Sequence, residues 1–202
     1  MALISLSHIE KPSSTVQWLR LVFSHLLFQD HTMALLDILI YPDQRLRQRA
    51  IAVDEVDAGI LNLIDDMIET MYHASGIGLA AVQINVARRI VVIDLSETQN
   101  EPRVFINPEI IEQSGSQLHE EGCLSVPGIF AEIGRAEKIK INYLNRNGKP
   151  ITEEADEMLA VCLQHEIDHL DGKVFVDRLS RLKQERIKKR LLKEAKQSAN
   201  NA

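Results

Sequence analysis

Two histidines lie four positions apart in the segment His165-Glu166-Ile167-Asp168-His169, and the acidic residue Glu166 directly follows the first of them. On a helix, positions four apart lie about 40° apart around the axis and about 6 Å along it, so both imidazoles can bind one divalent ion. Glu166 follows the first histidine directly and can act as a base toward a water molecule at that ion. The pattern predicts a metal site on a helix and a hydrolytic reaction.

A catalytic metal site of this kind needs a third protein ligand. In a metzincin the pattern continues to a third histidine, but Phe175 occupies that position although Gly172 fits. A thermolysin-like site needs a carboxylate about twenty residues onward, and the nearby acid, Glu185, lies in a basic segment. Neither protease pattern is complete, which leaves the two cysteines as candidates.

The cysteines differ in their reach toward the histidines. Cys162 shares their helix face, but it is about 7 Å of helical rise from the midpoint of the pair, too far for so short a side chain. We therefore expect Cys162 to be a wall residue. Cys123 follows Gly122 in an extended segment, and a strand there could carry its thiolate across to the helix.

Apolar periodicity indicates the elements that position these groups. Asp57 can cap a helix whose apolar residues recur at three and four positions until Gly76. Two more helices are expected at about 155–171 and 179–196. The remaining signals are β-branched runs at 90–93, 104–106 and 139–143, and a turn at Asn147-Gly148 before a strand at 151–152.

This order predicts an α+β fold: mostly antiparallel β-sheets packed around a central metal-binding helix, with an N-terminal and a C-terminal helix. The 202 residues are 45% hydrophobic and 26% charged, which excludes a disordered chain, collagen and a membrane bundle. Two cysteines are too few for a disulfide framework and fit a reducing compartment, so we expect a cytoplasmic protein. The aromatic content of 4% and net charge of -6 argue against a protein built to bind nucleic acid through base stacking and a basic surface.

The first 32 residues differ in character from the rest of the chain. The apolar stretch 16–28 is interrupted by Arg20 and His25, is shorter than the ~20 residues of a membrane span, and precedes no signal cleavage site. A regular globular pattern begins at Met33. We expect residues 1–32 to be an extension and residues 33–202 to form one catalytic domain.

The C-terminal segment is strongly basic. From Arg178 onward it has nine basic and two acidic residues, a net charge of +7, which leaves -13 for residues 1–177. Such a helix favours contact with a polyanion, since charges act over about 10 Å at 0.1 M salt. The alternative is a solvated amphipathic helix without a partner.

Three segments together resemble the peptide deformylase family, over about Met33 to the C-terminus. They are Gly76-Ile77-Gly78-Leu79-Ala80-Ala81-Val82-Gln83, Glu121-Gly122-Cys123-Leu124-Ser125 and Gln164-His165-Glu166-Ile167-Asp168-His169. The resemblance implies a hydrolase that removes the formyl group from the N-terminal formylmethionine of new polypeptides and releases formate. Phe130 and His119 depart from the pattern, because many members have an arginine and an aliphatic residue there.

The resemblance also implies a role for each matching residue. Cys123, His165 and His169 would bind Fe2+, with Zn2+, Ni2+ or Co2+ as possible replacements, and a metal-bound water would attack the formyl carbon with Glu166 as general base and acid. Gln83 and the Leu124 amide would stabilise the oxyanion. Ile77, Gly78 and Gly122 would hydrogen-bond the N-formylmethionyl peptide as an added strand. Methionine would enter a slot that Met158, Val161 and Cys162 can line with Ile77.

Two other functions remain open on the sequence. An H-E-x-x-H endopeptidase would cleave internal peptide bonds, and a non-catalytic metal-stabilised module would dock through its basic helix. For the deformylase, nascent chains suggest the ribosome surface as the partner of that helix, with no DNA and no membrane involved.

Overall fold

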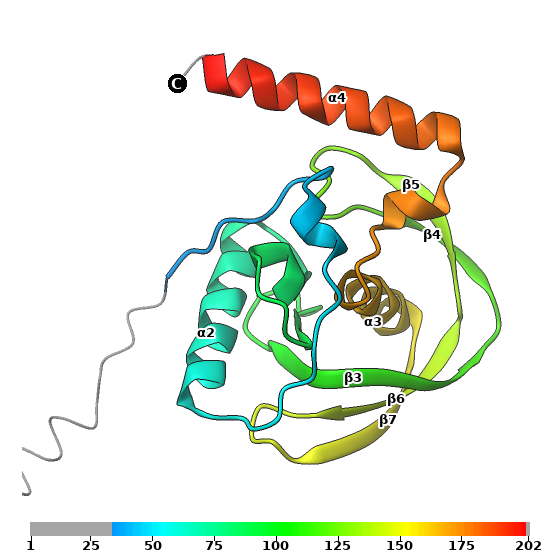
Figure 1. The fold of residues 1–202 in the computed structure, drawn as a ribbon. Coiled ribbons are helices and arrows are strands. Elements are labelled where there is room, and N and C mark those ends of the chain that lie inside the picture. The colour runs from blue at the N-terminus through cyan, green and yellow to red at the C-terminus, as the bar shows by residue number, and fades with distance from the viewer. Residues whose placement is uncertain (1–33, 201–202) are drawn as a thin grey trace, which may run out of the picture. The chain divides into compact units, whose positions relative to one another are not determined.

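Two antiparallel β-sheets and three α-helices make up residues 34–200, the part of the chain that the computed structural model describes (Figure 1). This confirms the predicted α+β class. The expectations for residues 1–32 lie outside the described residues. The helices are α2 (Ala58–His73), α3 (Glu157–Leu170) and α4 (Arg181–Asn200), and the strands are β1 (Gly78–Ala80), β2 (Ile90–Ile93), β3 (Arg103–Ser114), β4 (Gln117–Glu121), β5 (Ala131–Arg135), β6 (Lys138–Leu144) and β7 (Pro150–Asp156).

The larger sheet has the strand order β1-β2-β3-β6-β7, and all its neighbouring strands are antiparallel. All four residues of β2 are buried, which requires cover on both faces. Val91 and Ile93 pack into the cluster that includes Leu163 of α3, whereas Ile90 and Val92 pack into the cluster of α2. The two helices therefore cover opposite faces of the sheet.

Helix α2 forms where the sequence predicts a helix. The Asp57 carboxylate accepts a hydrogen bond from the Ile60 amide at 2.8 Å and caps the N-terminus. Ile64, Met67 and Met71 are fully buried along one face. The amide of Gly76 donates to the Met71 carbonyl, which ends the helix where the sequence indicated.

Helix α3 begins later than predicted. Residues 155 and 156 belong to strand β7, where Ala155 pairs with Ile139 and Asp156 with Lys138 of β6. Cross-strand pairing therefore extends the β6–β7 hairpin to the residue before the helix. The predicted turn is present, since the Asn145 amide donates to Lys149 and Gly148 has a φ of 71°. Helix α3 packs against β1, β2, β6 and β7.

A second, two-stranded sheet pairs β4 with β5. It shares a cluster of buried residues with the segment after α3 and with α4, including Val126, Ile133, Phe175 and Leu191. Helix α4 begins at Arg181 rather than 179, because Leu179 ends the short helix at Phe175–Arg178. Within residues 34–200, no helix is both long and apolar enough to cross a bilayer.

Candidate active site

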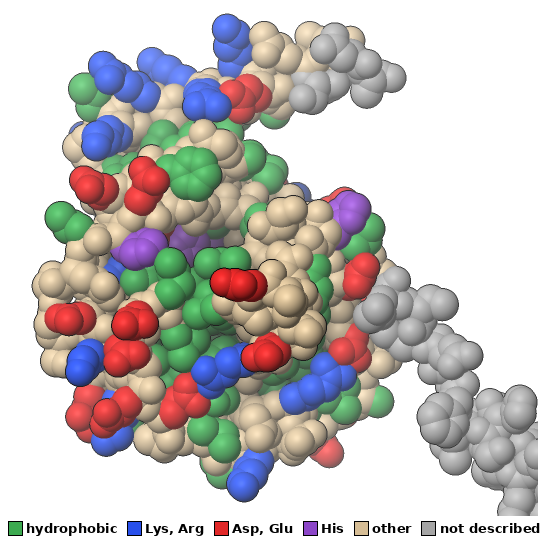
Figure 2. Space-filling view, turned by 180° about the vertical axis from the view of Figure 1, so that it is seen from behind, with side chains coloured by type: hydrophobic (Ala, Val, Ile, Leu, Met, Phe, Trp, Pro, Cys, Tyr) green, Lys and Arg blue, Asp and Glu red, His purple; other side chains and the backbone are tan. Residues whose placement is uncertain are grey.

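A cavity of about 650 Å³ opens between the edge strand β1 and the β4–β5 hairpin, with α3 along its floor. In Figure 2, histidine and hydrophobic side chains lie together on this face, below the basic side chains of α4. His169 lies deeper and is 1% exposed. The other predicted site residues all line the cavity: Ile77, Gly78, Gln83, Gly122, Cys123, Leu124, Met158, Val161, Cys162, His165 and Glu166.

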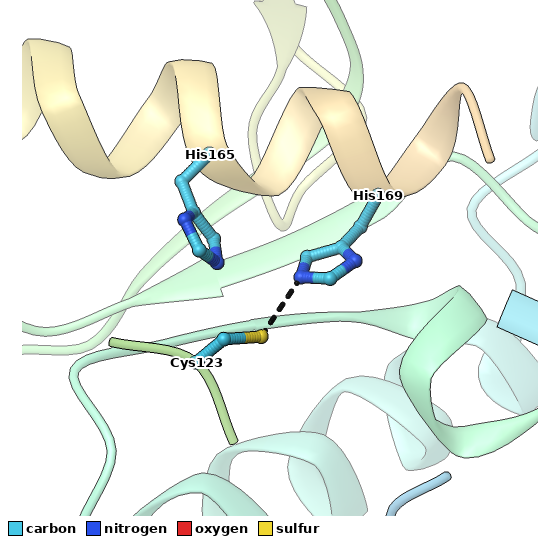
Figure 3. Close-up of side chains that lie close together, drawn as sticks. All are labelled: Cys123, His165 and His169. Carbon is cyan, nitrogen blue, oxygen red and sulfur yellow. Dashed lines mark hydrogen bonds between the residues drawn. The ribbon is translucent and has the colours of Figure 1, made fainter. Parts of the chain in front are cut away.

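Cys123, His165 and His169 are brought together at the bottom of the cavity. One candidate ligand atom from each residue lies within 4.8 Å of the others, and Cys123 Sγ is 3.2 Å from His169 Nε2. Both imidazoles extend from α3 toward the sulfur (Figure 3). A thiolate and two imidazoles are a donor set for Zn2+, Fe2+, Co2+ or Ni2+. The three side chains therefore fit a metal ion.

A buried carboxylate fixes the orientation of His165. Glu121 Oε2 is 2.7 Å from His165 Nδ1, so the other ring nitrogen of His165 is left to face the ligand set. Both Glu121 oxygens also accept hydrogen bonds from the guanidinium of Arg135, at 2.6 and 2.9 Å. Burial alone would raise the pKa of Glu121, but Arg135 and His165 lower it to about 2. Glu121 is therefore ionised at neutral pH beside the histidine.

The same arginine connects the site to the segment that precedes α4. Arg135 Nη1 donates to Asp168 Oδ2 at 2.6 Å, and Arg178 donates to the same oxygen at 2.7 and 3.0 Å. Neither Glu121 nor Arg135 is among the site residues predicted from the sequence. The available signal was the position of Glu121 two residues before Cys123. Its inward direction depends on the pairing of β4 with β5, whereas the sequence indicated only an extended segment around Cys123.

Glu166 lies against the first strand of the sheet. Burial raises its pKa to about 7, an effect that the neighbouring His165 partly opposes. Its Oε2 atom is buried and has no hydrogen-bond partner within residues 34–200. A Cβ atom added to Gly78 would lie 2.5 Å from Glu166 Oε1, so glycine leaves the space that this carboxylate occupies. A carboxyl group with a pKa near neutrality can accept and return a proton.

Two hydrogen-bond donors lie near the cysteine. Gln83 is 1% exposed, and its amide nitrogen is 3.6 Å from Cys123 Sγ and 3.1 Å from Ser125 Oγ. Its oxygen accepts from the Ala80 amide at 2.8 Å, which fixes the side chain. The backbone amide of Leu124 has no protein acceptor among the described residues. Both groups can stabilise negative charge that develops beside Cys123.

An apolar slot adjoins the ligand set on α3. Met158 is 38% exposed at its mouth, while Val161 and Cys162 are buried. Burial raises the pKa of Cys162 to about 12, so this thiol stays protonated. Cys162 is not in the group of candidate ligands, as its distance along the helix predicted.

These features define a class of protein: an α+β protein with a metal-ligand set and a buried carboxylate at the floor of a cleft. Residues 35–185 match the polypeptide deformylase family. The chain belongs to this family. The match confirms the resemblance to peptide deformylases that the sequence motifs indicated, and with it a metal-binding hydrolase.

Individual relatives agree with the family match. The chain is 57% identical to a peptide deformylase of Chromobacterium violaceum over 166 residues, 82% of this chain and 99% of the relative. A crystal structure of a peptide deformylase from Legionella pneumophila is 47% identical, with a TM-score of 0.78 over 82% of this chain and 98% of that one. A deformylase from Ehrlichia chaffeensis in complex with actinonin is 42% identical, with a TM-score of 0.77 over 80% and 98% of the two chains.

Proposed function

We propose that this enzyme removes the formyl group from the N-terminal formylmethionine of newly synthesised polypeptides and releases formate. The observation that carries the proposal is the convergence of Cys123, His165 and His169 beside the buried carboxylate of Glu166. We expect the reaction to take place in the cytoplasm, where nascent chains appear.

Cys123, His165 and His169 would hold one metal ion per chain, and we propose Fe2+, with Zn2+, Ni2+ or Co2+ as replacements. Such an ion lowers the pKa of a water ligand from about 15.7 toward 7 and so supplies hydroxide at neutral pH. Glu121 holds the His165 ring in place through Nδ1. Arg135 holds Glu121 in turn, so the ligand set is organised by buried ion pairs.

The remaining residues handle protons and developing charge. Glu166 accepts the proton of the attacking water and returns it to the departing amine, for which a pKa of about 7 is suited. The Gln83 side-chain amide and the Leu124 backbone amide donate to the formyl oxygen as it gains negative charge. Removal of one such donor costs about 2.7–4 kcal/mol in the transition state.

The cleft binds the peptide as an extended strand. Strand β1 is at the edge of its sheet, so the backbone of Gly78 can pair with a peptide on one side, together with the amide of Ile77 just before it. The Ile77 carbonyl already accepts a hydrogen bond from the Asp94 amide. Gly122, on the opposite wall, can pair with its other side. The methionine side chain enters the slot of Met158, Val161 and Cys162. Because main-chain groups carry the binding, the sequence beyond methionine can vary.

Amine release from formyl-Met-Ala-Ser and from acetyl-Met-Ala-Ser tests the reaction. We expect the anaerobic Fe2+-loaded enzyme to act on the formyl peptide far faster than on the acetyl peptide. Glu166→Ala should lower kcat by about 10²–10⁴-fold, the usual contribution of a general base, while metal content stays unchanged. A metal-loaded wild type that releases no amine would favour the metal-stabilised module, and cleavage of internal peptide bonds would favour the endopeptidase.

We also propose that α4 docks on the ribosome surface. Most of its basic side chains are exposed, whereas its buried Leu191 anchors it to the domain. Replacement of Lys183, Lys188, Lys189 and Lys193 with glutamine retains that anchor and removes four charges. We expect this variant to lose co-sedimentation with the ribosome. Its deformylation of a free peptide should stay unchanged. Co-sedimentation equal to wild type would contradict the proposal.

A further inference from the structure

A row of side chains with alternating charge leads from the molecular surface to the ligand set. Arg178, the last residue of the short helix before α4, is its outer end, and its side chain is 44% exposed. The guanidinium donates to Asp168 Oδ2 at 2.7 and 3.0 Å. Arg135 donates to the same oxygen at 2.6 Å and to both oxygens of Glu121. Glu121 in turn meets Nδ1 of His165, so the row ends on one ring of the ligand set.

The Asp168 carboxylate is held from two sides. Three N–H groups, one from Arg135 and two from Arg178, converge on Oδ2. Two cations on one oxygen restrict the carboxylate more than either alone, because each charge-assisted hydrogen bond limits its rotation. Removal of Arg178 would leave Arg135 as the one cation bound to that oxygen among the described residues, and the carboxylate could then turn toward water. Arg135 would thereby lose a fixed anchor on the side that faces away from Glu121.

The backbone around Arg178 is held in place by other contacts. Its neighbour Asp177 accepts a hydrogen bond from the Val174 amide at 2.9 Å and forms an ion pair with Arg47. Phe175, in the same short helix, is 1% exposed. The guanidinium of Arg178 is therefore not needed to place this segment of the chain. Its effect on the carboxylate of α3 can be separated from folding.

We propose that Arg178 is a positioning residue for the metal site, which acts through the buried ion pairs on the direction of the His165 ring. Groups that orient a ligating histidine from outside the ligand set typically change metal affinity by about 10–100-fold when they are removed. Arg178 acts through three intermediate side chains, so we expect a smaller loss of about three- to tenfold. This inference rests on the proposed metal site and deepens it, since it assigns that site a determinant at the junction with α4.

Metal affinity and the spectrum of the bound ion provide the test. We would measure Co2+ affinity by competition with a chelator, and the visible spectrum of the Co2+-loaded protein, for full-length wild type, Arg178→Ala, Arg178→Lys and Arg181→Ala. Arg181, the exposed first residue of α4, is the matched control, since it has the same charge and no ion pair within residues 34–200. Lysine can replace a contact to a single oxygen, because its ammonium supplies a point charge there.

We expect Arg178→Ala to bind Co2+ about three- to tenfold more weakly than wild type and to shift the absorption bands of the bound ion. Arg178→Lys and Arg181→Ala should stay within about twofold of wild type and keep its spectrum. Thermal unfolding of the metal-free proteins separates positioning from folding. Lower stability of Arg178→Ala with wild-type affinity and spectrum would overturn the inference, as would an equal loss of affinity in Arg181→Ala. A wild type that binds Co2+ but does not deformylate would instead contradict the proposed function.

Discussion

Gly78 and Glu166 show how a single missing side chain arranges this site. The carboxylate of Glu166 occupies the space where a Cβ atom of residue 78 would be. Gly78→Ala should therefore displace Glu166 and lower kcat by about 10–100-fold, because a displacement of about 1 Å at a reacting group can cost that much. Steady-state kinetics with a parallel assay of bound metal would separate this effect from loss of the ion.

A second glycine provides the control. A Cβ atom on Gly134 of β5 would have no atom within 4 Å, so Gly134→Ala should leave kcat within about twofold of wild type. If both variants behaved alike, Gly78 would have no specific part in placing Glu166.

The sequence allowed some residues to be placed and not others. His165 and His169 could be paired because helical spacing is local, and the structure brings them together with Cys123. Glu121 and Arg135 could not be paired from the sequence. Their ion pair joins the two strands of the β4–β5 hairpin, and the sequence pattern did not predict that hairpin. Groups that act through tertiary contacts leave little trace in local periodicity.

At the scale of elements, Asp94 connects α2 to the loop after β2. Its carboxylate accepts hydrogen bonds from Tyr72 Oη at 2.5 Å and from the amides of Ser96 and Glu101 at 2.8 and 3.0 Å. Burial would raise the pKa of Asp94, but these hydrogen bonds lower it to about 2. The carboxylate therefore stabilises the folded state as an anion.

Asp94→Asn should lower the free energy of unfolding by about 1–3 kcal/mol at pH 7, since asparagine cannot accept from all three donors. The unfolded aspartate has a pKa of about 3.9, so the stabilisation is complete above that pH and is lost as the pH falls through the folded value of about 2. Urea denaturation at several pH values should show the difference between variant and wild type shrinking below about pH 4. Glu97→Gln, at an exposed position in the same loop, is the control. It should change the free energy of unfolding by less than about 0.5 kcal/mol at every pH measured.

Helix α4 packs against the domain through Leu191 and the partly buried Ile187. Leu191 is 3% exposed against the second sheet's cluster, while its neighbour Leu192 is 43% exposed. Leu191→Ala should destabilise the protein by about 2–3 kcal/mol, and Leu192→Ala by less than about 0.5. Chemical denaturation would measure both, and equal losses would contradict the assigned packing.

The boundaries of elements were predicted less well than their types. The start of α3 was predicted two residues early because Ala155 and Asp156 have no local strand signal. Their pairing with β6 places them in β7 instead. The strand predicted at 104–106 is part of β3, which continues past Pro108 to Ser114 through two register shifts in its pairing with β6. Long-range pairing in both cases overrides local preference.

At the scale of the whole molecule, charge is divided between a body and a helix. The segment from Arg178 has a net charge of +7 and the preceding residues -13. If α4 contacts RNA phosphates, the logarithm of the ribosome-binding constant should fall linearly with the logarithm of salt concentration. Replacing four lysines by glutamine should reduce the slope by up to about 3–4, whereas a binding constant that ignores salt would exclude phosphate contacts.

The two edge strands of the large sheet, β7 and β1, differ in how readily another strand can pair with them. Strand β7 is one edge and carries Pro150, Glu153, Glu154 and Asp156, residue types that discourage another strand from pairing. Strand β1 is the other edge; it is three residues long and borders the cavity. An edge left open for any peptide backbone is also open to other copies of the chain. Its short length and its place in a cleft restrict self-association, so the molecule can present an unpaired strand without becoming a seed for aggregation.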